Sequence, residues 1–213
     1  MIKIIMFDLD GTLVDSSVDI TNALNFAIEP YKIGRMTVKE TIGLVGEGLT
    51  RLIEKVLGKE RAAIVPEVLE RFIGYYSEHL VEFTAPYPGV RETLERLGNY
   101  GKAVISNKRE SLSRKLLEEL DLAKHFDVIL GSDSVGEKKP SPKPIKKVLD
   151  FFSIGPEEAV IVGDSNYDID AGRAAGTKTI AVSYGYRDAG SLQGADFILN
   201  DIGELLPVLA RLH

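Results

Sequence analysis

The sequence contains no cysteine. Disulfide bonds, zinc–thiolate sites, iron–sulfur clusters and cysteine nucleophiles are therefore excluded. Basic residues are also few: 26 Lys and Arg stand against 32 Asp and Glu, which gives a net charge of -6. Proteins that bind nucleic acid or anionic membranes usually present a basic surface, so we expect neither as a partner.

Long apolar runs are lacking as well. No window of the sequence approaches the about 20 apolar residues of a membrane span. The first six residues form a short apolar stretch directly before Phe7-Asp8 and do not resemble a secretion signal, so we expect a cytoplasmic protein. The chain has 213 residues, of which 44% are hydrophobic and 27% are charged. This length and composition suit a globular protein with a sizeable core.

Short apolar runs rich in β-branched residues recur along the chain. They are nearly continuous rather than alternating, which is typical of strands covered on both faces in a parallel sheet. The runs are Ile2–Phe7, Ala103–Ile105, Val128–Leu130, Ala159–Val162, Thr179–Val182 and the weaker Phe197–Leu199.

Helical patterns lie between these runs from residue 85 onward. Leu112, Leu116 and Leu120 share one face after Ser111, a plausible N-cap, and Pro144 suits the first turn of another helix. Alternation of strand and helix predicts an α/β fold with a doubly wound, Rossmann-like parallel sheet.

Residues 16–84 follow a different pattern. They contain no convincing strand but three apolar helical faces, the first ended by Glu29-Pro30 and the second by Gly58. We therefore predict a core of residues 1–15 and 85–213, with residues 16–84 inserted as a small α-helical domain.

Polar side chains follow four of the predicted strands. In an open parallel sheet, ligands bind beyond the carboxyl ends of the strands, so these groups should share one crevice. The groups are Asp8 and Asp10, Ser106-Asn107, Lys138-Lys139, and Asp164 with Asp168.

The three carboxylates of Asp8, Asp10 and Asp164 would repel one another in a partly dry cleft unless a cation sits among them. The available ligand atoms are oxygens, which favours Mg²⁺, with Mn²⁺ as a substitute. Phosphoryl transfer fits this set: a cation and a lysine neutralise the phosphoryl oxygens while one carboxylate attacks phosphorus. A second carboxylate two residues away can act as general acid and then as general base.

Four segments, in chain order, resemble the four motifs of the haloacid dehalogenase superfamily, and the inserted helices resemble the cap of its phosphatase branch. Secondary features, such as Val45-Gly46-Glu47-Gly48, Ser106-Asn107-Lys108, Tyr184-Gly185-Tyr186 and Ala195-Asp196, resemble the phosphoglycolate phosphatases. The four motif segments are Asp8-x-Asp10-Gly11-Thr12, Ser106-Asn107, Lys139-Pro140-x-Pro142 and Gly163-Asp164-Ser165-x-x-Asp168.

The resemblance implies a role for each acidic residue. Asp8 would be the nucleophile that forms an aspartyl-phosphate, and also a magnesium ligand. Asp10 would be the acid/base and would offer its backbone carbonyl to magnesium. Asp164 would be a further magnesium ligand, and Asp168 would lie near the metal waters or the catalytic lysine.

The resemblance also implies the phosphate-binding groups. Ser106 would donate its hydroxyl and Asn107 its backbone N–H to the phosphoryl group, while Lys139 would pair with the nucleophile and the phosphoryl oxygens. Lys138 and Lys143 are close in sequence, but the family's spacing places the catalytic lysine directly before Pro-x-Pro, which selects Lys139.

Substrate specificity is expected to come from the inserted helices. Gly46, Glu47 and Gly48 precede a predicted helix, so this stretch is either a plain loop or a set of backbone N–H groups for a substrate carboxylate. Arg51 is the nearest cationic candidate.

The sequence therefore predicts a Mg²⁺-dependent phosphomonoester hydrolase for a small phosphorylated metabolite, with 2-phosphoglycolate as the first candidate. A pyrophosphatase, a sugar-phosphate phosphatase and a phosphoglucomutase-like enzyme stay open as alternatives. A dehalogenase is disfavoured because those enzymes lack the second aspartate, here Asp10. A non-catalytic binding module is disfavoured because the full set of motif residues is present, and a monomer and a homodimer are equally reasonable.

Overall fold

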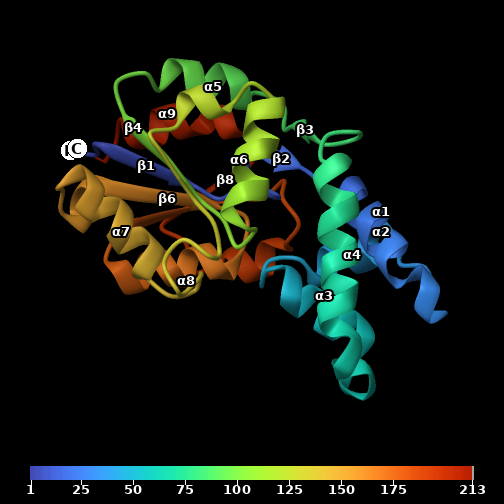
Figure 1. The fold of residues 1–213 in the computed structure, drawn as a ribbon. Helices are drawn as coiled ribbons and strands as arrows, with labels where there is room; N and C mark the ends of the chain where they lie inside the picture. Colours follow the sequence, from blue (N-terminus) through green and yellow to red (C-terminus); the bar gives the residue numbers. More distant parts are fainter. Residues whose placement is uncertain (213) are drawn as a thin grey trace.

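The computed structural model describes residues 1–212, with the side chain of Ala189 excepted (Figure 1). Its centre is a six-stranded sheet in the order β5-β4-β1-β6-β7-β8, and every neighbouring pair is parallel. Each apolar run predicted as a strand forms one, with ends that differ by up to two residues. The strands are β1 (Ile4–Phe7), β4 (Gly101–Ile105), β5 (Val128–Leu130), β6 (Ala159–Gly163), β7 (Lys178–Val182) and β8 (Phe197–Leu199).

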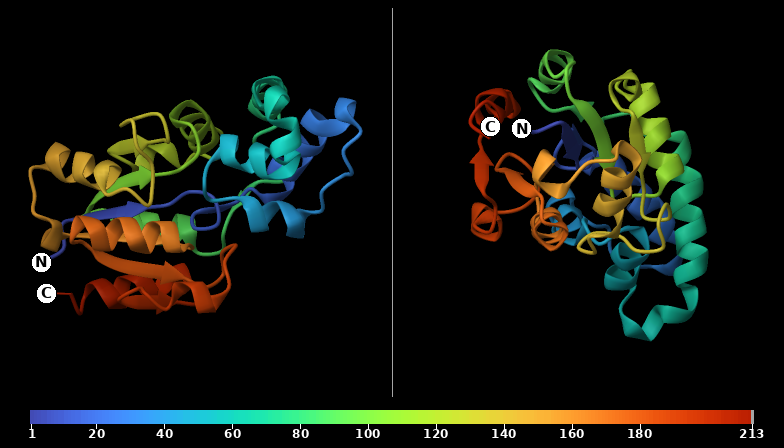
Figure 2. Two further views of the ribbon diagram at one scale, coloured as in Figure 1. Left: turned by 90° about the horizontal axis from the view of Figure 1, so that it is seen from below. Right: turned by 90° about the vertical axis from the view of Figure 1, so that its left-hand side faces the viewer.

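Helices cover both faces of this sheet (Figures 1 and 2). Successive side chains of a strand point to opposite faces. Ile5 and Phe7 accordingly pack in one buried cluster with α5, α6 and α9, whereas Ile4 and Met6 pack in another with α7 and α8. The predicted α/β doubly wound fold is thus confirmed. The helices are α5 (Val90–Arg96), α6 (Glu110–Glu119), α7 (Lys143–Phe152), α8 (Asn166–Ala175) and α9 (Leu205–Leu209), with short 3₁₀ turns η3 (Ala123–His125), η4 (Pro156–Glu158), η5 (Ala189–Leu192) and η6 (Ile202–Glu204).

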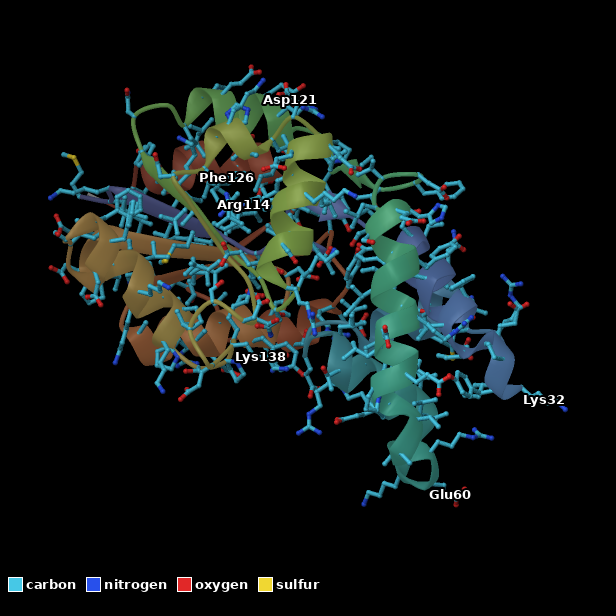
Figure 3. The ribbon with its side chains drawn as sticks, in the orientation of Figure 1. Lys32, Glu60, Arg114, Asp121, Phe126 and Lys138 are labelled. Atoms are coloured by element: carbon cyan, nitrogen blue, oxygen red, sulfur yellow. The ribbon has the colours of Figure 1, made fainter. Side chains whose placement is uncertain are left out.

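A second group of helices lies beside the carboxyl edge of the sheet (Figure 1, right). Helices α1 and α4 pack together, and α2 and α3 pack against them. Lys32 and Glu60 lie at the ends of this group that are far from the sheet (Figure 3). The elements are α1 (Ser17–Ile28), η1 (Glu29–Tyr31), α2 (Val38–Leu44), α3 (Leu49–Leu57), η2 (Lys59–Ile64) and α4 (Val65–Glu78).

The chain enters and leaves these helices at adjacent points. Strand β2 (Val14–Asp15) pairs antiparallel with β3 (Ala85–Pro86), so the two crossings form one narrow ribbon. The carboxylate of Asp19, which is buried in α1, accepts hydrogen bonds from the backbone N–H groups of Phe83 and Thr84 at 3.0 and 2.8 Å. This contact fixes the start of α1 to the returning strand.

The helices and the sheet share apolar contacts. Leu24, Phe72 and Tyr76 belong to the same buried cluster as Leu9 and Leu13, which follow β1. Within residues 1–212, no helix has both the length and the hydropathy that a membrane crossing requires.

Candidate active site

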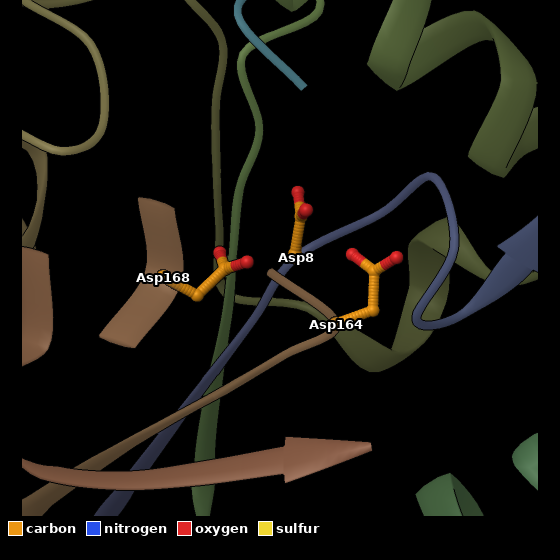
Figure 4. A group of neighbouring side chains, drawn as sticks. All are labelled: Asp8, Asp164 and Asp168. Carbon is orange, nitrogen blue, oxygen red and sulfur yellow. The ribbon is translucent and has the colours of Figure 1, made fainter. Parts of the chain in front are cut away.

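Three carboxylates converge at the carboxyl edge of the sheet (Figure 4). Asp8 follows the end of β1, Asp164 follows the end of β6, and Asp168 lies in the first turn of α8. One carboxylate oxygen from each lies within 4.8 Å of the others. The parallel topology therefore gathers groups that are 156 and 160 residues apart in sequence, counted from Asp8 (164 − 8 and 168 − 8).

Lys139 joins two members of this group. Its Nζ donates to Asp8 Oδ1 at 2.8 Å and to Asp168 Oδ1 at 2.6 Å, and its side chain is only 1% exposed. Burial alone would lower the pKa of Lys139, but the carboxylates of Asp168 and Asp8 outweigh it and hold that pKa above its usual range. The ammonium is therefore a fixed positive charge beside Asp8.

The two neighbouring lysines lie elsewhere. Lys138 donates its Nζ to the backbone carbonyl of Glu47 and lies where the core meets α3 (Figure 3), and Lys143 pairs with Glu137 on the surface. The motif spacing selected Lys139, and this is the lysine that the structure places against Asp8.

Asp168 serves the lysine and the start of its own helix. One carboxylate oxygen accepts from Lys139, and the other accepts from the N–H and the hydroxyl of Ser165 at 3.2 and 2.6 Å. With both oxygens engaged, Asp168 is suited to hold Lys139 in place rather than to bind an ion. Asp8 and Asp164 remain as the carboxylates facing the cavity.

The donor set fits a hard divalent cation. Burial, reinforced by the neighbouring acids, raises the pKa of Asp8 to about 8 and the pKa of Asp164 to about 7. Lys139 lowers both values but does not cancel the effect of burial. A cation lying between two carboxylates with raised pKa values would stabilise their ionised forms, and oxygen ligands suit Mg²⁺.

Two glycines shape the surroundings of Asp164. A Cβ on Gly11, which has φ of +87°, would lie 2.4 Å from Asp164 Oδ2, and a Cβ on Gly185 would lie 2.3 Å from the Cβ of Asp164. Only glycine permits both approaches, and Oδ2 of Asp164 also accepts from the backbone N–H of Tyr186 at 2.7 Å. The carboxylate is thereby enclosed by backbone.

Asp10 lies beside Asp8 and is held by two donors. Its Oδ1 accepts from the hydroxyl of Ser16 at 2.5 Å and from Lys108 Nζ at 2.6 Å. Lys108 also donates to the hydroxyl of Tyr76, from α4, at 2.7 Å. Lys108 belongs to the motif Ser106-Asn107-Lys108, but the sequence predicts no role for it, because its contacts are with residues 98 and 32 positions away.

Ser106 and Asn107 follow β4 and line the same cavity. The side-chain amide of Asn107 donates to the carbonyls of Gly46 and Lys139, at 2.7 and 2.9 Å, and so joins the helices to the core. Its buried Oδ1 has no hydrogen-bond partner among the described residues, and a bound polar molecule would satisfy it.

The site cavity has a volume of about 70 Å³. Its core side carries Asp8, Asp10, Ser106 and Asp164, and its helical side is largely apolar. The apolar lining comprises Ile20, Val45, Leu49, Leu52, Phe72 and Leu112.

The residues predicted to set specificity divide into two groups. Gly46 and Gly48 line the cavity. The carboxylate of Glu47 instead pairs with Lys55 and accepts from the hydroxyl of Tyr167. Arg51 pairs with Glu54 on an exposed face of α3, with a side chain 61% exposed, and does not line the cavity.

Core side chains hold the segment of residues 42–48 that precedes α3. The guanidinium of Arg187 donates to the carbonyls of Ile42, Gly43 and Val45, at the end of α2. Arg187 was not predicted from the sequence, since an arginine after a glycine-containing loop carries no signal of its partner. The adjacent motif Tyr184-Gly185-Tyr186 was its only indication.

Paired carboxylates and a buried lysine at the carboxyl edge of a doubly wound sheet are groups suited to phosphoryl transfer. Residues 5–182 match the model of the haloacid dehalogenase-like hydrolases. The chain belongs to this family, as the motifs predicted, and it is a phosphoric monoester hydrolase.

Relatives match over nearly the whole chain. A phosphoglycolate phosphatase of Aquifex aeolicus (strain VF5) is 42% identical over 97% of this chain and 96% of its own length. One from Chromobacterium violaceum is 41% identical over 98% and 96%. The crystal structure of a "predicted phosphoglycolate phosphatase" from Haemophilus somnus 129pt superposes with a TM-score of 0.91 at 29% identity, covering 98% of both chains. A haloacid dehalogenase-like family hydrolase from Streptococcus pneumoniae gives 0.88 at 27% identity, again over 98% of both.

Proposed function

We propose that this protein is a Mg²⁺-dependent phosphomonoesterase that acts through an aspartyl-phosphate on Asp8, with 2-phosphoglycolate as its substrate. The observation that carries the proposal is the Asp8–Lys139–Asp168 chain of buried ion pairs facing Asp164, with Asp10 alongside. The substrate is suggested by the names of the full-length relatives and by the small size of the cavity.

Asp8 is oriented for attack. Its Oδ1 accepts from the N–H of Leu9 at 2.7 Å and from Lys139 at 2.8 Å, and 14% of its side chain remains exposed. The carboxylate forms a bond to phosphorus as the ester bond to the leaving oxygen breaks. Lys139, the hydroxyl of Ser106 and the backbone N–H of Asn107 stabilise the phosphoryl oxygens.

Asp10 manages the proton. Ser16 and Lys108 hold one carboxylate oxygen, and the other gives its proton to the departing oxygen. Asp10 then takes a proton from water, which attacks phosphorus, breaks the bond to Asp8 and releases inorganic phosphate. A Mg²⁺ held by Asp8, Asp164 and the backbone carbonyl of Asp10 would neutralise charge on the phosphoryl group when bound.

We also propose that residues 16–84 act as a cap over this site. The β2–β3 ribbon joins them to the core at one place, and they provide the apolar wall of the cavity. Such a cover excludes bulk water during phosphoryl transfer.

A kinetic screen tests the function. With Mg²⁺, kcat/KM for 2-phosphoglycolate should exceed that for sugar phosphates and for pyrophosphate, and EDTA should abolish turnover. Asp10→Asn should lower kcat/KM, which reports the phosphorylation step, about 10²- to 10⁴-fold for 2-phosphoglycolate but less for an aryl phosphate, because an aryl leaving group needs little protonation. Equal rates on all substrates, or full activity in EDTA, would refute the proposal.

A further inference from the structure

Lys108 is a buried lysine with one hydrogen-bond donor that the proposed reaction does not use. Its side chain is 8% exposed and it lines the cavity. Its Nζ donates to Asp10 Oδ1 at 2.6 Å and to the hydroxyl of Tyr76 at 2.7 Å. An ammonium has three N–H donors, so one donor remains after these two contacts.

The surroundings of Lys108 demand a negative partner. The neighbouring lining is apolar, with Ile20, Leu52 and Phe72 among it, and a buried charge is costly unless it is paired and hydrogen-bonded. Asp10 is the one carboxylate that pairs with Lys108 among the described residues.

The other cations near the cavity are either paired or exposed. Lys139 pairs with Asp8 and Asp168 on the phosphoryl side. Arg187 gives its guanidinium to backbone carbonyls of residues 42–45, and Arg109 is exposed to solvent. Lys108 is thus the buried cation with a spare donor on the side where Asp10 meets the leaving group.

We propose that Lys108, oriented by Tyr76, is the specificity-determining residue that binds a carboxylate on the leaving group of the substrate. This rests on the proposed phosphatase function. Asp10 must contact the leaving oxygen, and Lys108 contacts Asp10. In a substrate whose carboxylate is bound by Lys108, only a few atoms of the leaving group therefore separate that carboxylate from the leaving oxygen. Phosphate esters of small 2-hydroxy acids fit this geometry, and their carboxylate would accept from the third donor of Lys108.

Discrimination follows from the same contact. A site built to pair with a charged or polar group rejects an analogue that lacks it, because the buried group of the site is then left unpaired. A sugar phosphate or an uncharged alkyl phosphate would leave Lys108 facing hydroxyl or methylene groups within an apolar wall. The carboxylate is recognised at Lys108 and not at Arg51, which lies on the surface.

The test compares two substrates that differ at one group. The first is 2-phosphoglycolate, and the second is 2-hydroxyethyl phosphate, which has a hydroxymethyl group in place of the carboxylate. Lys108→Met should lower kcat/KM for both substrates, because Asp10 loses a donor. It should also lower the ratio of kcat/KM for 2-phosphoglycolate to that for 2-hydroxyethyl phosphate about 100-fold, the effect of truncating one partner of a buried charge pair. Tyr76→Phe should lower kcat/KM for 2-phosphoglycolate about tenfold, since a hydrogen bond to a charged group is lost.

A binding measurement separates recognition from acid/base catalysis. In the Asp8→Asn background, calorimetry should show that Lys108→Met weakens the binding of 2-phosphoglycolate about 100-fold but leaves the affinity for inorganic phosphate nearly unchanged. Lys115→Met is the matched control: this exposed lysine of α6 also reaches α4, by donating to the carbonyl of Ser77, but does not line the cavity. Lys115→Met should change the affinity for neither ligand.

Two results would overturn the inference, and they are distinguishable from failure of the proposed function. Equal losses on both substrates, with unchanged binding of 2-phosphoglycolate, would mean that Lys108 only positions Asp10. A Lys108→Met variant that keeps the wild-type preference would mean that the carboxylate binds elsewhere. Failure of the proposed function would appear in the wild-type protein instead, as absence of any preference for 2-phosphoglycolate.

Discussion

The two sides of the cavity are lined by different kinds of residue: charged side chains on the core side and apolar side chains on the helical side. On the core side, buried charges hold one another: Lys139 joins Asp8 to Asp168 with a side chain only 1% exposed. On the helical side, apolar side chains form the wall, and core side chains hold the backbone of residues 42–48 by its carbonyls. Tyr76 is the polar exception on the helical wall, through its hydroxyl.

This difference suggests a division of labour. Paired buried charges are fixed in place before the substrate arrives, which is the condition for electrostatic stabilisation of a transition state. Hydrogen bonds to backbone carbonyls depend little on side-chain identity, so the helical wall can vary in sequence while its attachment is kept. Changes on the core side should therefore affect kcat, and changes on the helical side should affect KM or stability.

The largest effect is expected at Asp8. Asp8→Asn replaces the attacking carboxylate with an amide, so kcat should fall by about 10⁴-fold or more, as for other catalytic nucleophiles. Steady-state kinetics with 2-phosphoglycolate measures this loss. Asp150→Asn, an exposed change on α7, is the control and should keep wild-type kcat. A residual rate within tenfold of wild type would remove Asp8 from its assigned role.

The next expectation concerns metal and pH on the core side. Burial raises the pKa of Asp8 to about 8 and the pKa of Asp164 to about 7, above the ordinary value of 3.8. At pH values between the ordinary pKa of 3.8 and these raised pKa values, the folded protein without cation binds more protons than the unfolded chain. The contribution of these groups to the free energy of unfolding therefore falls as the pH rises through this window.

A bound cation offsets that loss by stabilising the ionised carboxylates. The increase in Tm on adding Mg²⁺ should thus be larger at about pH 8 than at about pH 5.5, as measured by scanning calorimetry. Asp164→Asn should flatten this dependence, whereas Asp150→Asn should preserve it. An Mg²⁺ shift in Tm that is equal at both pH values would contradict the assigned metal ligands.

The core side was largely predictable from the sequence, and the helical side was not. Each motif residue follows an apolar run, and parallel strands present their carboxyl ends at one edge. The topology alone therefore brings Asp8, Ser106 and Asp164 together. The spacing before Pro-x-Pro also identified Lys139 as the lysine nearest Asp8. These inferences depend on local sequence and on one general rule of α/β sheets.

The helical side depends on contacts between distant residues. The guanidinium of Arg187 reaches carbonyls more than 140 residues earlier in the chain, and no local pattern announces such a contact. Arg51 was proposed from proximity in sequence to Gly48, yet its place on α3 turns it to solvent. Helix α2 was missed because its single buried residue, Thr41, gives no apolar stripe.

Arg187 offers a test of the attachment between the two sides. Arg187→Ala removes charged hydrogen bonds to the end of α2, each worth about 1.5–3 kcal/mol, so residues 42–48 should be held less firmly against the cavity. KM for 2-phosphoglycolate should rise about tenfold, with kcat changed less than about threefold. Arg114→Ala, which removes an exposed arginine paired with Glu110, should leave both constants unchanged. A fall in kcat with constant KM would mean that Arg187 acts on the catalytic groups of the core side and not on the position of the helical wall.

The smallest effect is expected at the start of α2, away from the cavity. Thr37 and Glu40 form a capping box: the Thr37 hydroxyl accepts from the Glu40 N–H, and the Glu40 carboxylate accepts from the Thr37 N–H. Thr37→Ala should lower the free energy of unfolding by about 1 kcal/mol, and so lower Tm by about 2–4 °C. Thr37→Ser keeps the acceptor and should lower it less. Since α2 ends at the carbonyls held by Arg187, kcat/KM should stay within twofold of wild type if that attachment, and not the helix start, positions the wall. A larger loss of kcat/KM would show that the helical wall depends on the whole of α2.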